Sequence, residues 1–177
     1  MVAAGTDPAN VSARVELGAG EATVGTGLPV LDFLVGELAR SGRLRVALEV
    51  APDTVDRAVA AAGRALGEKL APLLRVPAAS GFGFAWLPAD EALAGAVIEI
   101  TDNPLVAANV DFSGQRVGGL GSDVIARFVD ELAAGAGLNV HIRVLEGRDP
   151  EHVLRALFKA LGAAIGQACR TPEGGRA

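Results

Sequence analysis

The chain has few side chains suited to proton transfer near neutral pH, and most of them gather at two expected helix starts. Asp53 and Asp56 form one group, three residues apart. Glu151 and His152 form the other, and the remaining histidine, His141, lies in an alternating strand pattern. Carboxylates and imidazoles with shifted pKa values can act as general acids and bases. These five residues are therefore the candidate catalytic residues.

Each group also has a purely structural interpretation. Asp53 and Asp56 suit a helix N-terminus, as a cap and a first-turn acid. The run Asp149-Pro150-Glu151 is typical of an N-cap, a proline at the first helical position and a first-turn acid. His141 alternates with apolar residues, as a buried and hydrogen-bonded histidine would. Both interpretations stay open, because a capping acid can also take part in chemistry.

Two further side chains are candidate substrate-binding residues. Lys159 falls in a helical pattern and suits either an anion site or a solvated helix surface. Glu91 follows Asp90 and either contributes a carboxylate to a site or lies at the start of a short helix. Gly118–Gly121 lacks the Lys-Ser/Thr of a phosphate-binding loop. Cys169, the only cysteine, is expected to be a structural or exposed thiol.

The elements that must position these residues repeat along the chain. Residues 37–50 match residues 131–144, and 63–67 match 162–166. Each copy contains an amphipathic helix, a glycine-containing break, an alternating strand and a second helix. The second helices are expected at about 54–71 and 150–168, and further strands at 13–17, 22–26, 95–101 and 105–112.

This order, β-β-α-β-α used twice, predicts an α+β fold in which duplicated half-domains form a layered sheet and helix sandwich. We expect one domain over residues 13–169, made of two pseudo-symmetric repeats at about 13–90 and 91–169. Flexible tails are expected at 1–12 and 170–177.

Composition excludes several classes of partner. The net charge is −5 and no basic run is present, so no nucleic-acid surface is expected. No apolar run is long enough to span a bilayer, and the first residues do not form a signal peptide. We therefore expect a cytoplasmic protein with no nucleic-acid or membrane partner.

Four segments, in this order along the chain, resemble the imidazoleglycerol-phosphate dehydratase family. They are Thr26-Gly-Leu-Pro-Val-Leu-Asp32, Leu87-Pro-Ala-Asp-Glu-Ala-Leu93, Leu138-Asn-Val-His141 and Phe158-Lys-Ala160. The resemblance covers residues 14–169 and implies the family's fold, of the ribosomal S5 domain 2-like kind. It also implies removal of water from imidazoleglycerol phosphate in histidine biosynthesis, a pair of manganese ions, and sites formed between subunits. A homo-oligomer, a trimer or a higher symmetric assembly, is therefore expected.

The chain departs from the family where metal ligands are expected. The family's His-His-x-x-Glu motif reads Pro52-Asp-Thr-Val-Asp56 in the first copy and Glu151-His-Val-Leu-Arg155 in the second. Phe33 and Ser41 replace family histidines, and Gly81 and Asn103 replace its phosphate-binding arginines. A degenerate metal site follows from these departures. We expect no bound metal or other cofactor, with His141 and His152 as residual candidate ligands.

These departures predict a repurposed lyase or isomerase, dehydratase-like, that acts on a small molecule by acid–base chemistry at an inter-subunit pocket. One alternative is a non-catalytic paralogue that serves as a scaffold or regulatory subunit. The other is an authentic imidazoleglycerol-phosphate dehydratase of histidine biosynthesis, against which the lost ligands argue. The sequence does not identify the small molecule.

Overall fold

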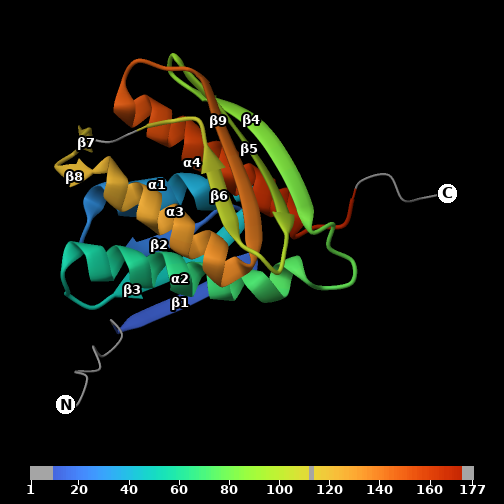
Figure 1. Ribbon diagram of the computed structural model, residues 1–177. Coiled ribbons are helices and arrows are strands. Elements are labelled where there is room, and N and C mark those ends of the chain that lie inside the picture. The colour runs from blue at the N-terminus through green and yellow to red at the C-terminus, as the bar shows by residue number, and fades with distance from the viewer. Residues whose placement is uncertain (1–9, 112–113, 173–177) are drawn as a thin grey trace.

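The computed structural model describes residues 10–111 and 114–172, which form two β-sheets with four long helices between them (Figure 1). The three-stranded sheet has the order β1 (Val11–Leu17), β3 (Leu44–Val50), β2 (Ala22–Gly25). The four-stranded sheet has the order β4 (Phe82–Ala89), β5 (Ala92–Ile100), β9 (Leu138–Glu146), β6 (Leu105–Ala108). The helices are α1 (Pro29–Gly42), α2 (Val55–Leu74), α3 (Ser122–Ala136) and α4 (Pro150–Ala168), and β7 (Arg116–Val117) pairs with β8 (Leu120–Gly121).

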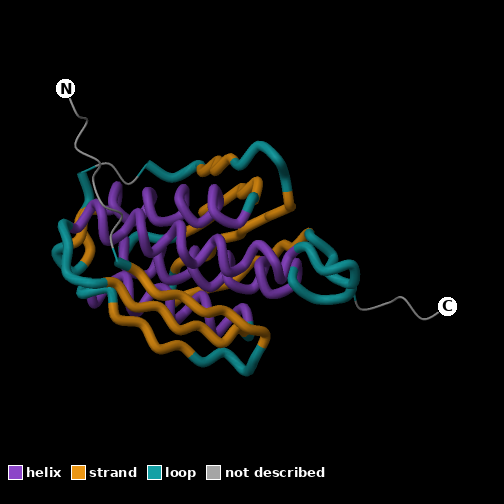
Figure 2. The backbone as a smooth tube through the Cα atoms, turned by 90° about the horizontal axis from the view of Figure 1, so that it is seen from below, coloured by secondary structure: helices purple, strands orange, loops and turns teal. Residues whose placement is uncertain are grey.

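The helices lie in two layers between the sheets (Figure 2). α1 and α2 pack on the three-stranded sheet, whereas α4 and α3 pack on the four-stranded sheet. Across the middle, α1 packs against α4 and α2 packs against α3. Phe128 of α3 stacks on Phe158 of α4 with ring centroids 5.9 Å apart, and both rings are fully buried. Because the pairs α1–α4 and α2–α3 each join one half of the chain to the other, each half completes the core of the other half.

The two sheets share one pairing pattern. β3 pairs antiparallel with β1 and parallel with β2. β9 likewise pairs antiparallel with β5 and parallel with β6. β4 extends the second sheet at its edge through β5. The predicted α+β fold class is confirmed, while the division into two repeats of common origin stays a prediction.

Local contacts explain where two of the helices begin. Before α1, the backbone N–H and hydroxyl of Thr26 both donate to Asp32 Oδ1, at 3.0 and 2.5 Å. This contact fixes the loop that leads into the first turn of α1. Before α4, Asp149 Oδ1 accepts a hydrogen bond from the N–H of Glu151 at 2.8 Å, and Pro150 is the first helical residue. The predicted cap of α4 is therefore confirmed.

Glycines set the distance between the paired helices. A Cβ at Gly162 of α4 would collide with the carbonyl oxygen of Leu38 in α1. A Cβ at Gly63 of α2 would lie 2.5 Å from the carbonyl oxygen of Phe128 in α3. Gly162 and Gly63 are among the residues that match between the two copies in the sequence. The repeated glycines therefore allow the backbones of both helix pairs to approach closely.

Four sequence expectations differ from the structure. β4 (Phe82–Ala89) was not among the expected strands. The expected strand over 105–112 ends at Ala108. β1 already begins at Val11, inside the predicted tail over 1–12, and residues 1–9 of that tail lie outside the described residues. At the other end, Arg170 donates to the carbonyl oxygens of Gly42 and Arg43, so the chain is still anchored there. The domain boundaries stay a prediction.

Membrane insertion by a helix finds no support in the structure. Within residues 10–111 and 114–172, no helix combines the length and the apolar character needed to cross a bilayer. The cytoplasmic location stays a prediction.

We predict that Gly162→Ala lowers the free energy of unfolding by about 1–3 kcal/mol, because the added methyl group forces α1 and α4 apart. Gly36→Ala is the matched control, since Gly36 also lies inside a helix, α1, and a Cβ there meets nothing within 4 Å. That control should gain about 0.5–1 kcal/mol from helix propensity. Urea unfolding followed by circular dichroism measures both, and equal stabilities for the two variants would contradict the role of Gly162.

Candidate functional site

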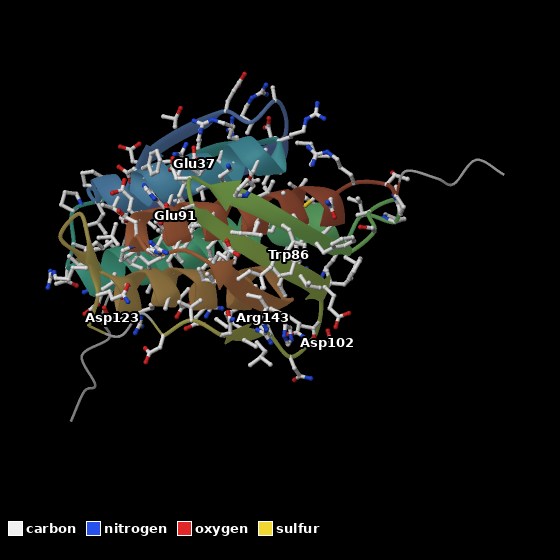
Figure 3. All side chains as sticks on the ribbon, turned by 90° about the horizontal axis from the view of Figure 1, so that it is seen from above. Glu37, Trp86, Glu91, Asp102, Asp123 and Arg143 are labelled. Atoms are coloured by element: carbon white, nitrogen blue, oxygen red, sulfur yellow. The ribbon has the colours of Figure 1, made fainter. Side chains whose placement is uncertain are left out.

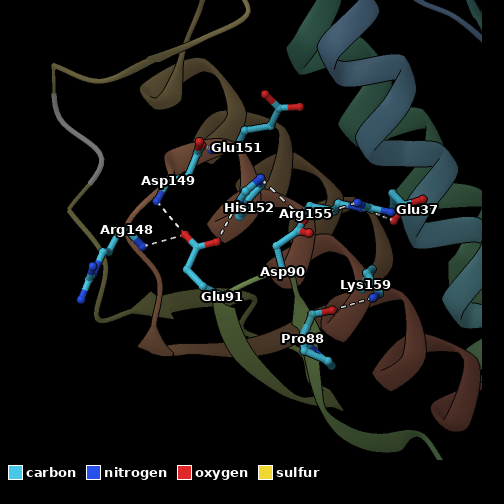
Figure 4. Close-up of polar contacts among 10 residues, drawn as sticks. All are labelled: Glu37, Pro88, Asp90, Glu91, Arg148, Asp149, Glu151, His152, Arg155 and Lys159. Atoms are coloured by element: carbon cyan, nitrogen blue, oxygen red, sulfur yellow. Dashed lines mark hydrogen bonds and ion pairs between the residues drawn. The ribbon is translucent and has the colours of Figure 1, made fainter.

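A polar cluster forms where the turn between β4 and β5 meets the start of α4 (Figure 4). The turn consists of only two residues, Asp90 and Glu91, because Ala89 pairs directly with Ala92. Asp90 has a φ of 50°, the left-handed conformation that such tight hairpin turns require. The expectation that Asp90 and Glu91 begin a short helix is therefore wrong. The hairpin instead places both carboxylates beside α4.

Glu91 holds His152 in a defined orientation. The Nδ1 atom of His152 lies 2.5 Å from Glu91 Oε2. The other carboxylate oxygen, Oε1, accepts hydrogen bonds from the backbone N–H groups of Arg148 and Asp149 at 3.1 and 3.0 Å. On the other side of the ring, Nε2 lies 3.5 Å from Asp90 Oδ2. The imidazole is thus fixed by a carboxylate that the backbone itself anchors, and its exposed fraction is 34%.

The contacts shift the pKa values of both partners toward their charged forms. The backbone N–H of Asp149 and the side chain of His152 are the main causes that lower the pKa of Glu91 to about 2. The hydrogen bond that His152 donates to Glu91 raises the pKa of His152 above its usual 6.5. The raised pKa widens the pH range over which the imidazole is protonated.

Arg155 extends the cluster toward α1 (Figure 4). Its Nε donates to Glu37 Oε2 at 3.0 Å, and its Nη1 lies 3.8 Å from Asp90 Oδ2. The guanidinium also lies over the ring of Phe33, 5.7 Å from the centroid. The hydrogen bond that Arg155 donates to Glu37 raises the pKa of Arg155, which therefore stays a permanent cation in this cluster.

Sequence reasoning missed Glu37, whose side chain is only 4% exposed although it carries a charge. It forms ion pairs with Arg40 and with Arg155. A signal was present in the sequence: Glu37 lies three residues after the buried Leu34 and three before Arg40. A carboxylate on the edge of an apolar helix face needs a cation, and that requirement indicates a polar contact with another element.

Two other candidates lie on the same helix as His152. Lys159 Nζ donates to the carbonyl oxygen of Pro88 in β4 at 2.5 Å. Glu151 is exposed and lines a mostly apolar cavity of about 240 Å³, together with Phe33 and Leu154. The structure therefore brings four sequence-predicted residues, Glu91, Glu151, His152 and Lys159, to the first half of α4 and its surroundings.

The remaining candidates lie elsewhere in the fold. Asp53 precedes α2, accepts a hydrogen bond from the N–H of Thr54 and pairs with Arg57. The N-cap position is Thr54, so the predicted capping role of Asp53 is wrong, whereas Asp56 does lie in the first turn. His141 lies on β9, opposite Val97 of β5. Val97 is six residues from Glu91 along the chain, and at roughly 3.4 Å per residue this separates His141 from the cluster.

The described residues of one chain do not assemble a group of metal donors by themselves. Nowhere in residues 10–111 and 114–172 do three or more His, Cys, Asp or Glu side chains converge as a metal site requires. Both ring nitrogens of His152 face carboxylates. Cys169 is buried, and burial raises the pKa of its thiol to about 11, so it does not supply a thiolate at neutral pH.

Fold and cluster together define a layered α+β protein in which a carboxylate orients an imidazole on α4, and the preceding residue, Glu151, lines a cavity. The model of the imidazoleglycerol-phosphate dehydratase family matches residues 26–165, and the chain belongs to this family. The family membership predicted from the four segments is thus confirmed.

Individual relatives agree with the family match. Imidazoleglycerol-phosphate dehydratase of Pelobacter propionicus is 34% identical over 157 residues, which are 86% of this chain and 80% of that protein. The protein of the same name from Clostridium botulinum strain Kyoto is 32% identical over 173 residues, 95% of this chain and 88% of its own length. A crystal structure of the dehydratase from Staphylococcus aureus has a TM-score of 0.83 at 22% identity, covers 92% of this chain and 95% of its own, and shows the shared fold.

These relatives overturn two predictions from the sequence. Neither the repurposed lyase or isomerase nor the non-catalytic scaffold holds, because relatives named as the dehydratase match the chain at 32–34% identity over most of its length. The expected absence of a cofactor is also wrong, since the chain belongs to the family whose reaction, as described above, uses manganese.

The pH dependence of the His152–Glu91 contact gives a prediction. Glu91 contributes stability above its unfolded pKa of 4.5, which is lost as the pH falls toward about 2. His152 contributes stability below 6.5, which is lost as the pH rises through its raised folded pKa.

Glu91→Gln should lower the pKa of His152 toward 6.5, as measured by NMR titration, whereas Glu49→Gln on the other sheet should leave it unchanged. An unshifted His152 in Glu91→Gln would rule out the contact.

Proposed function

We propose that this protein is an imidazoleglycerol-phosphate dehydratase, a lyase that removes water from imidazoleglycerol phosphate. The observation that carries the proposal is the identity of 34% to a dehydratase over 86% of this chain. The polar cluster supports it, because elimination of water needs a proton donor for the leaving hydroxyl group. His152 is such a donor, as Glu91 favours its protonated form.

The cluster suggests a role for each side chain. His152 gives its proton to the hydroxyl group as the carbon–oxygen bond breaks, and the group leaves as water. Asp90, 3.5 Å from His152 Nε2, is the carboxylate placed to accept the proton from the neighbouring carbon. Arg155 and Lys159, one turn apart on α4, supply the positive charge that a phosphate group attracts. Glu91 positions His152 without touching the substrate.

Manganese belongs to this proposal although one chain does not assemble three donors. When bound, the ion acts as a Lewis acid toward nitrogen and oxygen ligands. We propose that a homo-oligomer, a trimer or a larger symmetric assembly, brings donors from more than one copy together, with His141 as the candidate histidine, because the protonated His152 has no free lone pair for a metal. The roles given above for His152 and Asp90 do not depend on the metal.

The activity has a direct test. Purified protein should convert imidazoleglycerol phosphate to a product one water lighter, detected by mass spectrometry, and added Mn²⁺ should increase the rate. The gene should also restore growth without histidine to cells that lack the dehydratase. Absence of product both with and without Mn²⁺ would overturn the proposal.

Variants test the assignment of roles. His152→Gln should lower kcat by about 10²–10⁴-fold, the usual contribution of a positioned acid. Glu91→Gln should lower kcat less and should move the limb of the pH profile that reports His152 toward lower pH. Glu49→Gln, an exposed glutamate of β3, is the control and should behave as the unmodified protein. A His152→Gln enzyme with unchanged kcat would exclude His152 as the acid.

A further inference from the structure

A cavity of about 170 Å³ lies between α3, α4 and the β6 edge of the four-stranded sheet. Apart from Asp130, every described residue that lines it is apolar. Leu157 and Phe158 of α4 and Ile142 of β9 form its buried wall. Ala126 and Asp130 of α3 lie on its exposed side. The cavity therefore has an apolar interior and a single ionisable group at its mouth.

A short strand and two small side chains explain why this space is left open. β6 ends at Ala108, whereas β9 beside it continues to Glu146. Ala108 and Ala126 both line the cavity, and neither side chain is large enough to fill the space between the strand and α3. Beyond β6, the side-chain amide of Asn109 accepts from the N–H of Val144 and donates to its carbonyl oxygen, at 2.8 and 3.1 Å. The chain thus stays attached to the sheet edge, and the cavity keeps its wall.

Asp130 is a charged group with no direct partner in the described part of the chain. Its carboxylate forms no hydrogen bond and no ion pair there, whereas the adjacent Glu131 pairs with Arg64 at 2.8 Å. Partial burial is the main cause that raises the pKa of Asp130; the charge of Glu131 adds to the rise and that of Arg127 opposes it. A cation placed against this carboxylate would favour its charged form. A positively charged ligand group would therefore give Asp130 the ion pair that the described residues do not supply.

The size and the lining of the cavity define the chemistry of a suitable ligand. An apolar cavity of about 150 Å³ can bind benzene, so 170 Å³ suits a six-membered ring with one small substituent. The apolar wall offers no hydrogen bonds, so the body of the ligand must be apolar as well. An anionic substituent would meet the like charge of Asp130. A protonated amino group instead pairs with it.

We propose that this cavity binds a small apolar molecule that carries one protonated amino group, with its apolar body against Leu157 and Phe158 and its ammonium group beside Asp130. The site is distinct from the cavity that Glu151 lines, although Leu154 forms part of the wall of both. The inference goes beyond the dehydratase proposal and does not depend on it, because its readout is binding and not turnover.

Three ring compounds of similar size test the chemistry by isothermal titration calorimetry. Cyclohexylamine, which is protonated at neutral pH, should bind about three- to tenfold more tightly than the uncharged cyclohexanol, and cyclohexanecarboxylate should bind more weakly than either. Asp130→Asn should lower the affinity for the amine to that for the alcohol and leave the alcohol unaffected. Asp123→Asn is the matched control, because it removes the same charge from the exposed start of α3 (Figure 3) and should change neither affinity.

Filling the cavity tests where the ligand binds. Ala126→Leu should weaken binding of both the amine and the alcohol at least about tenfold, because the larger apolar side chain takes the space of the ring. Glu151→Gln changes the other cavity and should leave both affinities as they are. Circular dichroism confirms that each variant is folded.

Four results would each overturn the proposal. They are equal affinities for the amine and the alcohol, an amine affinity that Asp130→Asn does not lower, unchanged binding in Ala126→Leu, and a loss of binding in Glu151→Gln. Absence of binding at millimolar cyclohexylamine would overturn it as well, since it would show that another segment or another copy of the chain closes the cavity.

Discussion

Close backbone contact between paired helices is the constraint on which the rest of this structure depends. Gly162 and Gly166 of α4 lie against the backbone of α1, and Gly63 and Gly67 of α2 lie against the backbone of α3. Without side chains between them, the backbones gain many van der Waals contacts, each small but large in total. Each pair joins a helix of one half of the chain to a helix of the other half. Neither sheet with its helices can therefore bury its apolar face alone.

The position of the polar cluster follows from this packing. α4 is held between α1 and the four-stranded sheet, so its first turns pass both Glu37 and the hairpin at Asp90 and Glu91. Glu37 is buried, and a buried carboxylate without a cation costs several kcal/mol. Arg155 meets that need from α4 and is thereby fixed beside Asp90. The cluster is thus a consequence of how close α1 and α4 lie, since a wider separation would leave Glu37 with only the exposed Arg40 of its own helix as a partner.

Periodicity and local motifs could predict most of the fold but only part of the cluster. The alternating pattern of 44–50 and the cap at Asp149 depend on neighbours in the chain, so both are visible in the sequence. β4 was not predicted, because Gly83 is needed for close contact with α4. That contact is tertiary, and in the sequence alone a glycine is more typical of a loop than of a strand. The contact between His152 and Glu91 joins residues 61 apart, which no local pattern reports. Glu37 was hidden for the same reason, because its partner Arg155 lies 118 residues away.

The exposure of the cluster indicates that its contacts orient the His152 side chain more than they stabilise the fold. His152 and Glu91 are 34 and 43% exposed, and ion pairs at such sites add little to the free energy of folding. Glu91 is nevertheless held by two backbone N–H groups in addition to His152, which restricts its rotamer. A surface pair that served solubility would not need such anchoring. An imidazole that must present one nitrogen to a substrate does need it, because an acid out of place by about 1 Å loses much of its effect. The anchored geometry therefore agrees with the family membership of the chain more closely than with a surface contact of no consequence.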